Sequence, residues 1–106
     1  MPLRIFGNMS APANTGSFTQ ISTLMPSGAN AAANNLTVGS EATFFMEAQN
    51  NLVMRYGSAA TGTGGSDYAE MTIIAGKIYE FRGFWPTSAY IRSADASART
   101  FSLWQA

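Results

Sequence analysis

The chain has 106 residues, a length that fits one domain, and 46% of them are hydrophobic while only 11% are charged. Six basic residues balance six acidic ones and are scattered along the chain, which argues against a nucleic-acid partner because phosphate binding needs clustered cations. Histidine and cysteine are absent, which excludes imidazole and thiol catalysis, disulfides and metal sites built from those side chains.

Residues 1–16 combine Pro, Gly and Asn with small residues and show no hydrophobic period. This composition fits a frayed terminus, or an extended N-terminal arm that docks on a neighbour through Leu3, Ile5 and Phe6. We predict such an arm over residues 1–16, followed by a single β-sandwich domain over residues 17–106.

Residues 17–24 are rich in Thr and Ile and predict a first strand. Residues 25–35 contain Pro, Gly and several Asn and predict a loop. A short strand and a Gly-Ser turn are expected next. A longer strand over 42–49 follows, in which Phe44, Met46 and Ala48 share one face.

Asn50-Asn51 is a serviceable hairpin turn because Asn tolerates left-handed backbone, so it is expected to join this strand to the strand that begins at Leu52. Residues 58–67 predict a glycine-rich loop. A phosphate-binding loop would need a helix after it and usually a Lys, whereas a strand follows here and no Lys is present.

The last third of the chain predicts four strands. Two of them flank an Ala-Gly-Lys turn within residues 68–83. Pro86 then interrupts, because it cannot donate to a strand ladder. A short strand over 89–93 places Ile91 inward, and the segment 99–105 places Phe101 and Leu103 on one face.

Short strands recur along the chain, and no segment has the period of an amphipathic helix. This pattern predicts an all-β fold: an antiparallel β-sandwich of about seven or eight short strands, with either a jelly-roll or an immunoglobulin-like topology.

No residue pattern points to catalysis. A hydrolase that used paired carboxylates would have to draw on the six acidic residues. We expect instead that these face solvent, some of them paired across strands with Arg55, Arg82 or Arg92. The sequence therefore predicts neither an enzyme nor a bound cofactor or metal. The acidic residues are Glu41, Glu47, Asp67, Glu70, Glu80 and Asp95.

Four aromatic residues near strand ends are the most informative feature for function: Phe84, Trp85, Tyr90 and Trp104. They fit three roles that the sequence leaves open. They can belong to the core, they can anchor a protein interface, where aromatics are enriched, or they can stack on sugar rings.

The order of strands and turns in the second half of the chain resembles small all-β bacteriophage virion proteins of the capsid decoration or cement type. The likeness covers roughly residues 36–106. It is carried by the Ala75-Gly76 turn, the aromatic strand Tyr79-Glu80-Phe81, the run Tyr90-Ile91-Arg92-Ser93, the turn Asp95-Ala96-Ser97 and the final strand Thr100-Phe101-Ser102-Leu103-Trp104.

The resemblance implies a structural protein of the virion that is made in the host cytoplasm and sits on the capsid surface, with the major capsid protein as its partner. It also implies a homo-oligomer, with a trimer favoured over a dimer. The candidate interface residues are then Leu3, Ile5, Phe6, Phe84, Trp85, Tyr90 and Trp104. The alternative is a minor tail or fibre component that acts as a glycan-binding module. No nucleic acid or membrane is expected as a partner.

Overall fold

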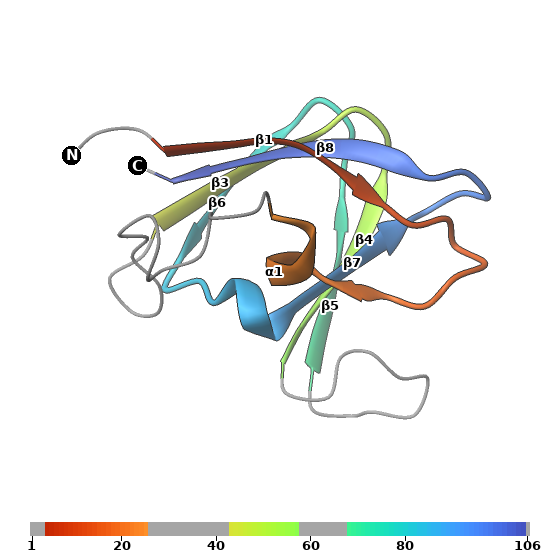
Figure 1. Cartoon of the computed structure of the whole chain (residues 1–106), viewed down its shortest axis with the longest axis horizontal. Coiled ribbons are helices and arrows are strands. Elements are labelled where there is room, and N and C mark those ends of the chain that lie inside the picture. Colours follow the sequence, from red (N-terminus) through yellow and green to blue (C-terminus); the bar gives the residue numbers. More distant parts are fainter. Residues whose placement is uncertain (1–3, 26–42, 58–67, 106) are drawn as a thin grey trace.

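The computed structural model describes residues 4–25, 43–57 and 68–105, and of residues 4–8 it describes the backbone only. These segments form two four-stranded sheets whose strand pairs are all antiparallel (Figure 1). The predicted all-β sandwich is confirmed.

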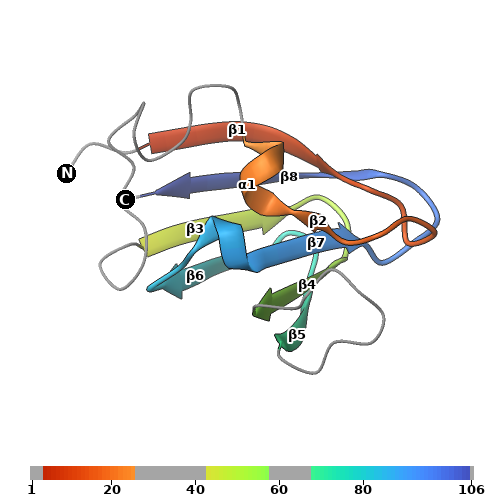
Figure 2. The same ribbon diagram turned by 60° about the horizontal axis from the view of Figure 1, so that its bottom comes forward.

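One sheet has the strand order β1-β8-β3-β6, and the other has the order β2-β7-β4-β5 (Figure 2). The first sheet contains β1 (Arg4–Ala11), β8 (Arg99–Gln105), β3 (Thr43–Ala48) and β6 (Ile78–Arg82). The second contains β2 (Thr19–Gln20), β7 (Ala89–Ser93), β4 (Leu52–Gly57) and β5 (Tyr68–Ile73). A helical turn, α1 (Ile21–Leu24), follows β2, and a 3-10 helix, η2 (Pro86–Ser88), precedes β7.

Strand pairing follows a single rule. The first strand pairs with the eighth, the second with the seventh, the third with the sixth and the fourth with the fifth. This is the pattern of a long hairpin of four strand pairs that folds over into two sheets. The β3–β8 pair joins two of these strand pairs into the first sheet, and the β4–β7 pair joins the other two into the second. Of the two topologies that the sequence left open, the molecule has the jelly roll.

The core lies between the two sheets and is built from alternate residues of the strands. Phe44, Met46 and Ala48 of β3 are buried as the period of two predicts, and so are Ile91 of β7 and Phe101 and Leu103 of β8. A core of this kind stabilises the fold by roughly 25 cal/mol for each Å² of apolar surface that it removes from water. The other buried apolar residues of the cluster are Met9, Ala11, Ile21, Leu52, Met54, Ile73, Phe84 and Ala89.

The prediction of an extended arm over residues 1–16 is wrong for residues 4–11. These residues form β1, an edge strand that pairs with β8 from Arg4 opposite Gln105 to Ala11 opposite Arg99. Met9 and Ala11 are buried in the core. The pairing shifts register between Ile5 and Asn8, and such an irregularity disrupts the alternation by which a strand is recognised in a sequence.

Two further local predictions are corrected. The strand expected over residues 17–24 is only Thr19–Gln20, after which the helical turn α1 places Ile21 in the core. The Asn50-Asn51 segment does not close a hairpin, because it connects β3 of one sheet to β4 of the other. The turn around Gly76 likewise crosses between the sheets, from β5 to β6.

Hydrogen bonds link the connections that cross between the sheets. The Ala75 N–H donates to Oδ1 of Asn51 over 2.9 Å, and the Ala94 N–H donates to the Asn51 carbonyl over 3.1 Å. The Asn14 N–H donates to the Asp95 carbonyl over 2.9 Å. One end of the sandwich is therefore held by contacts among four of the crossing connections, β1–β2, β3–β4, β5–β6 and β7–β8. The expected short strand near residue 36, all of the expected loop 25–35 except Met25, and the whole of the expected loop 58–67 lie outside the described residues.

Candidate functional site

Exposed large apolar residues are spread along one flank of the sandwich. Within the part of the chain that the structure describes, four large apolar residues are exposed, and all of them lie between positions 71 and 85. This segment runs from β5 through the crossing turn and β6, and these two strands are the edges of their sheets. We call it the β5–β6 flank. Its exposed residues are Met71, Ile74, Ile78 and Trp85.

A hollow of about 290 Å³ opens in this flank, between the edges of the two sheets. One wall comes from β4 and β5, and the other comes from β6 and the two residues that follow it. Most of its lining is apolar or aromatic, with one carboxylate and one guanidinium at the side of β6. The lining residues are Met54, Tyr56, Met71, Glu80, Phe81, Arg82, Gly83 and Phe84.

Trp85 is the exposed aromatic residue of this flank, and its backbone is held from both sides. The Trp85 N–H donates to the Tyr56 hydroxyl over 2.8 Å, and the Trp85 carbonyl accepts from the Ser88 N–H over 2.8 Å. The next residue, Pro86, begins η2 and is buried. An exposed ring on a fixed backbone loses little conformational freedom when a partner covers it, which favours tight contacts.

Phe84 was predicted among the interface residues and belongs instead to the core. Only 3% of its surface is exposed, and its ring lies 5.2 Å from the Phe44 ring, 5.2 Å from the Phe81 ring and 5.4 Å from the Tyr56 ring, measured between centroids. A partner protein has no access to a side chain packed in this way. Of the adjacent pair Phe84 and Trp85, only the second is available to a neighbour.

The remaining candidates are placed on different surfaces. Tyr90 is partly buried on β7 between two buried neighbours, Ala89 and Ile91, and so it faces outward from the second sheet. Trp104 is partly buried on β8 between the buried Leu103 and Gln105, and it faces outward from the first sheet.

The Trp104 ring stacks on Phe45 with 5.8 Å between centroids. Because Tyr90 and Trp104 face opposite sides of the sandwich, they do not form one platform for a sugar chain together with Trp85. Leu3 lies outside the described residues, and Ile5 and Phe6 are placed only as backbone in β1.

Several charged side chains of the described strands take part in ion pairs. Arg55 of β4 contacts Glu70 of β5 over 2.8 Å, a cross-strand pair of the kind that the sequence predicts. Arg55 and Arg92 also stack on the ring of Phe18, with the guanidinium carbons 4.1 and 4.2 Å from its centroid.

Glu80 pairs with Arg82 of the same strand over 2.6 Å, and this hydrogen bond and charge raise the pKa of Arg82. Among the residues that line the hollow, Glu80 and Arg82 are the two with charged side chains.

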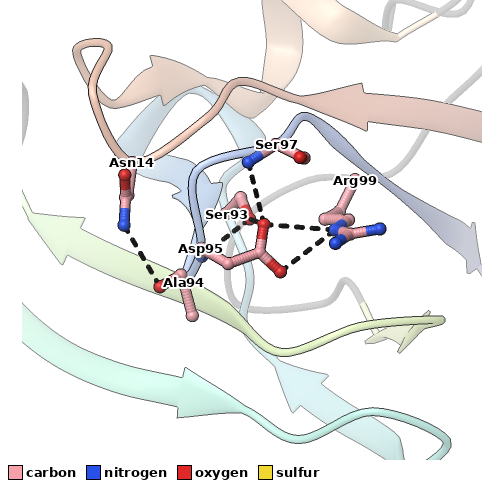
Figure 3. Close-up of polar contacts among 6 residues, drawn as sticks. All are labelled: Asn14, Ser93, Ala94, Asp95, Ser97 and Arg99. Atoms are coloured by element: carbon pink, nitrogen blue, oxygen red, sulfur yellow. Dashed lines mark hydrogen bonds and ion pairs between the residues drawn. The ribbon is translucent and has the colours of Figure 1, made fainter.

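Asp95 organises the turn between β7 and β8 (Figure 3). Its carboxylate accepts from the Ser97 N–H over 2.9 Å, from the Ser93 hydroxyl over 3.1 Å and from Nε of Arg99 over 3.1 and 3.2 Å. The Ser97 hydrogen bond, followed by those of Ser93 and Arg99, lowers the pKa of Asp95 against an opposing effect of desolvation. The side chain of Asn14 donates to the Ala94 carbonyl over 3.3 Å and joins the β1–β2 connection to this turn.

The sequence reasoning missed three of the four exposed residues of the flank: Met71, Ile74 and Ile78. The adjacent pair Ile73-Ile74 carried a usable signal, because successive residues of a strand point to opposite faces and one of the two must leave the core. Ile73 is buried, and Ile74 is 50% exposed.

Across residues 4–25, 43–57 and 68–105, no cluster of three or more carboxylates that could hold a metal ion is present. No helix in these ranges is long and apolar enough to cross a membrane. No family model matches the chain, and no curated protein sequence matches it.

Proposed function

We propose that this protein is a structural component of a bacteriophage virion, a decoration or cement protein that binds and stabilises the major capsid shell. The observation that carries the proposal is the β5–β6 flank, which bears the exposed large apolar residues of the described chain and a mostly apolar hollow that one of them, Met71, lines. Exposed apolar patches commonly mark contacts with other proteins.

Three other observations support the proposal. The chain has a low content of charged residues and no net charge, a composition that resists association poorly. Jelly rolls recur among viral capsid domains, although they also occur in lectins and in cupins, so the fold supports the role by analogy only. The resemblance of residues 36–106 to phage virion proteins agrees with both.

Trp85 is the residue that we assign to the centre of the capsid contact. Tryptophan is enriched at the positions that contribute most to interface energy, and truncation of such a residue costs about 2 kcal/mol or more. Capsid attachment would also gain from repetition, because many copies bind one particle and oligomers bind through several sites at once.

The test is the binding of purified Trp85→Ala protein to phage particles that lack the protein, measured by cosedimentation. We expect attachment to weaken roughly 30-fold, which corresponds to the loss of about 2 kcal/mol. Thr87→Ala, which removes an exposed side chain from the same loop, is the matched control and should bind as the wild type does. Undiminished binding by Trp85→Ala would exclude Trp85 as the anchor.

The number of copies in each particle tests the location. Hundreds of copies are expected on a capsid surface, whereas a dozen or fewer would place the protein in the tail or at the portal. Binding to a glycan array that disappears in Trp85→Ala would instead support the alternative, a glycan-binding module of a tail or fibre.

A further inference from the structure

The outer edge of β6 carries two opposite charges on one face of the strand. Tyr79 and Phe81 pack against the core, so the alternate residues Ile78, Glu80 and Arg82 face outward from the first sheet. Ile78 is 56% exposed, and Glu80 and Arg82 are exposed as well. Within the described ranges β6 pairs only with β3, so its other side presents backbone hydrogen-bonding groups at the edge of the sheet.

This edge is complementary to itself. Two antiparallel copies of a strand can be related by a twofold axis at one residue. That residue then lies opposite its own equivalent, and the residue before it lies opposite the residue after it in the other copy. An axis through Phe81 therefore places Glu80 of each copy opposite Arg82 of the other, and it forms two ion pairs at once. Opposite charges directly across two strands attract, and like charges in that position repel.

Neighbouring registers lack this match. An axis through Glu80 places the two Glu80 carboxylates against each other, and it places each Arg82 opposite Ile78. An axis through Tyr79 places each Glu80 opposite Ile78. A register shifted by a single residue would place outward-facing side chains of one copy opposite inward-facing side chains of the other. The charges thus favour the register centred on Phe81.

β5, the neighbouring edge strand, has no comparable pattern. Glu70 is its single charged residue, so an antiparallel copy of β5 offers it no opposite charge in any register. The hollow also favours β6, because Glu80, Phe81 and Arg82 all line it together with the exposed Met71. A second copy placed along β6 would cover the side of this hollow and the outward face of Ile78.

We propose that two copies of this chain associate through antiparallel pairing of β6 about Phe81, which joins their first sheets into one continuous sheet. The formal net charge of zero leaves no overall repulsion between the copies. This inference does not depend on the proposed attachment to a capsid, and it uses a different part of the β5–β6 flank from Trp85.

Charge reversal tests the register. In E80R both outward charges of the strand become positive, and in R82E both become negative, so each variant opposes like charges in its own dimer. We expect each to weaken dimerisation at least about tenfold in analytical ultracentrifugation, since two attractive pairs become two repulsive ones. Both side chains lie at the surface, with 42% and 82% of their area exposed for Glu80 and Arg82, so the fold should persist.

Two combinations should restore association. An equimolar mixture of E80R and R82E should form a heterodimer, because each negative pair then faces a positive pair. The double variant E80R/R82E should dimerise as the wild type does, because it exchanges the two charges without loss of complementarity. A mixture or a double variant that stays monomeric would overturn the proposed register.

Thr100→Arg is the control for an added surface charge, since Thr100 is exposed on β8 opposite Ser10 of β1. It should leave the dimer unchanged. Hydrogen exchange gives a second readout: amides of β6 should become more protected as the concentration of wild-type protein rises, whereas those of E80R should not. The proposal fails if the wild type stays monomeric at high concentration, or if E80R and R82E dimerise as the wild type does.

Discussion

Two adjacent aromatic residues, Phe84 and Trp85, have opposite environments and so contribute differently to the molecule. Phe84 is packed among Phe44, Tyr56 and Phe81, whereas Trp85 is 46% exposed. The sequence could not decide between them, because both precede Pro86 in a segment without strand alternation. The turn of the backbone after Gly83, which has a φ of +68°, decides which ring enters the core.

Alanine substitution should separate the two residues. We expect Phe84→Ala to lower the free energy of unfolding by about 3–5 kcal/mol, because it leaves a cavity among packed rings. Trp85→Ala should lower it by about 1 kcal/mol or less, as is usual for exposed positions. Urea denaturation of both variants measures the difference, and equal losses would contradict the assignment of Phe84 to the core and Trp85 to the surface.

Asp95 should make stability depend on pH in the acid range. Its pKa in the folded protein lies below the ordinary value of 3.8, so the carboxylate stabilises the fold above that value and loses its effect as the pH falls through the folded pKa. We expect Asp95→Asn to be less stable than the wild type at neutral pH and to approach the stability of the wild type as the pH falls through the folded pKa of Asp95. Denaturation at several pH values measures this, with Glu47→Gln as the control. A gap between Asp95→Asn and the wild type that is constant at all pH values would show that the charge is not responsible.

Among the elements, regular strands with one buried face were predictable and irregular ones were not. β3 and β8 were recognised because Phe44, Met46, Phe101 and Leu103 alternate with outward residues. β1 was missed because its register shifts before Asn8. The turn α1 was mistaken for strand because four residues are too short for a helical period to be read, so the Thr and Ile content dominated.

The role of β1 as a sheet strand has a direct test. Deletion of residues 1–16 should unfold the protein or lower its melting temperature strongly, because it removes Met9 and Ala11 from the core and exposes the edge of β8. Met9→Ala is the milder variant and should cost about 2–5 kcal/mol, whereas Ser10→Ala, at an exposed position, should cost little. A truncated protein as stable as the full chain would support a free arm instead.

At the scale of the whole molecule, the sequence predicted the sandwich and the approximate number of strands but not the jelly-roll topology. Local alternation shows where strands lie, whereas topology depends on which distant strands pair. Asn50-Asn51 illustrates this limit, since the same turn residues suit a hairpin and a crossing between sheets. The sequence also could not predict the exposed flank. Met71 and Ile78 are exposed because β5 and β6 are edge strands, and their local sequence pattern does not show this.

The pairing of β1 with β8 also bears on how the chain is made. Arg4 lies opposite Gln105, so β1 has no partner until β8 has been translated. At elongation rates of about 5–20 residues per second, this leaves β1 waiting for roughly 5–20 s. Pairing over such a long sequence separation is also slow, on the order of milliseconds to seconds. Until β8 emerges, β1 keeps an unpaired edge that a holdase chaperone could bind.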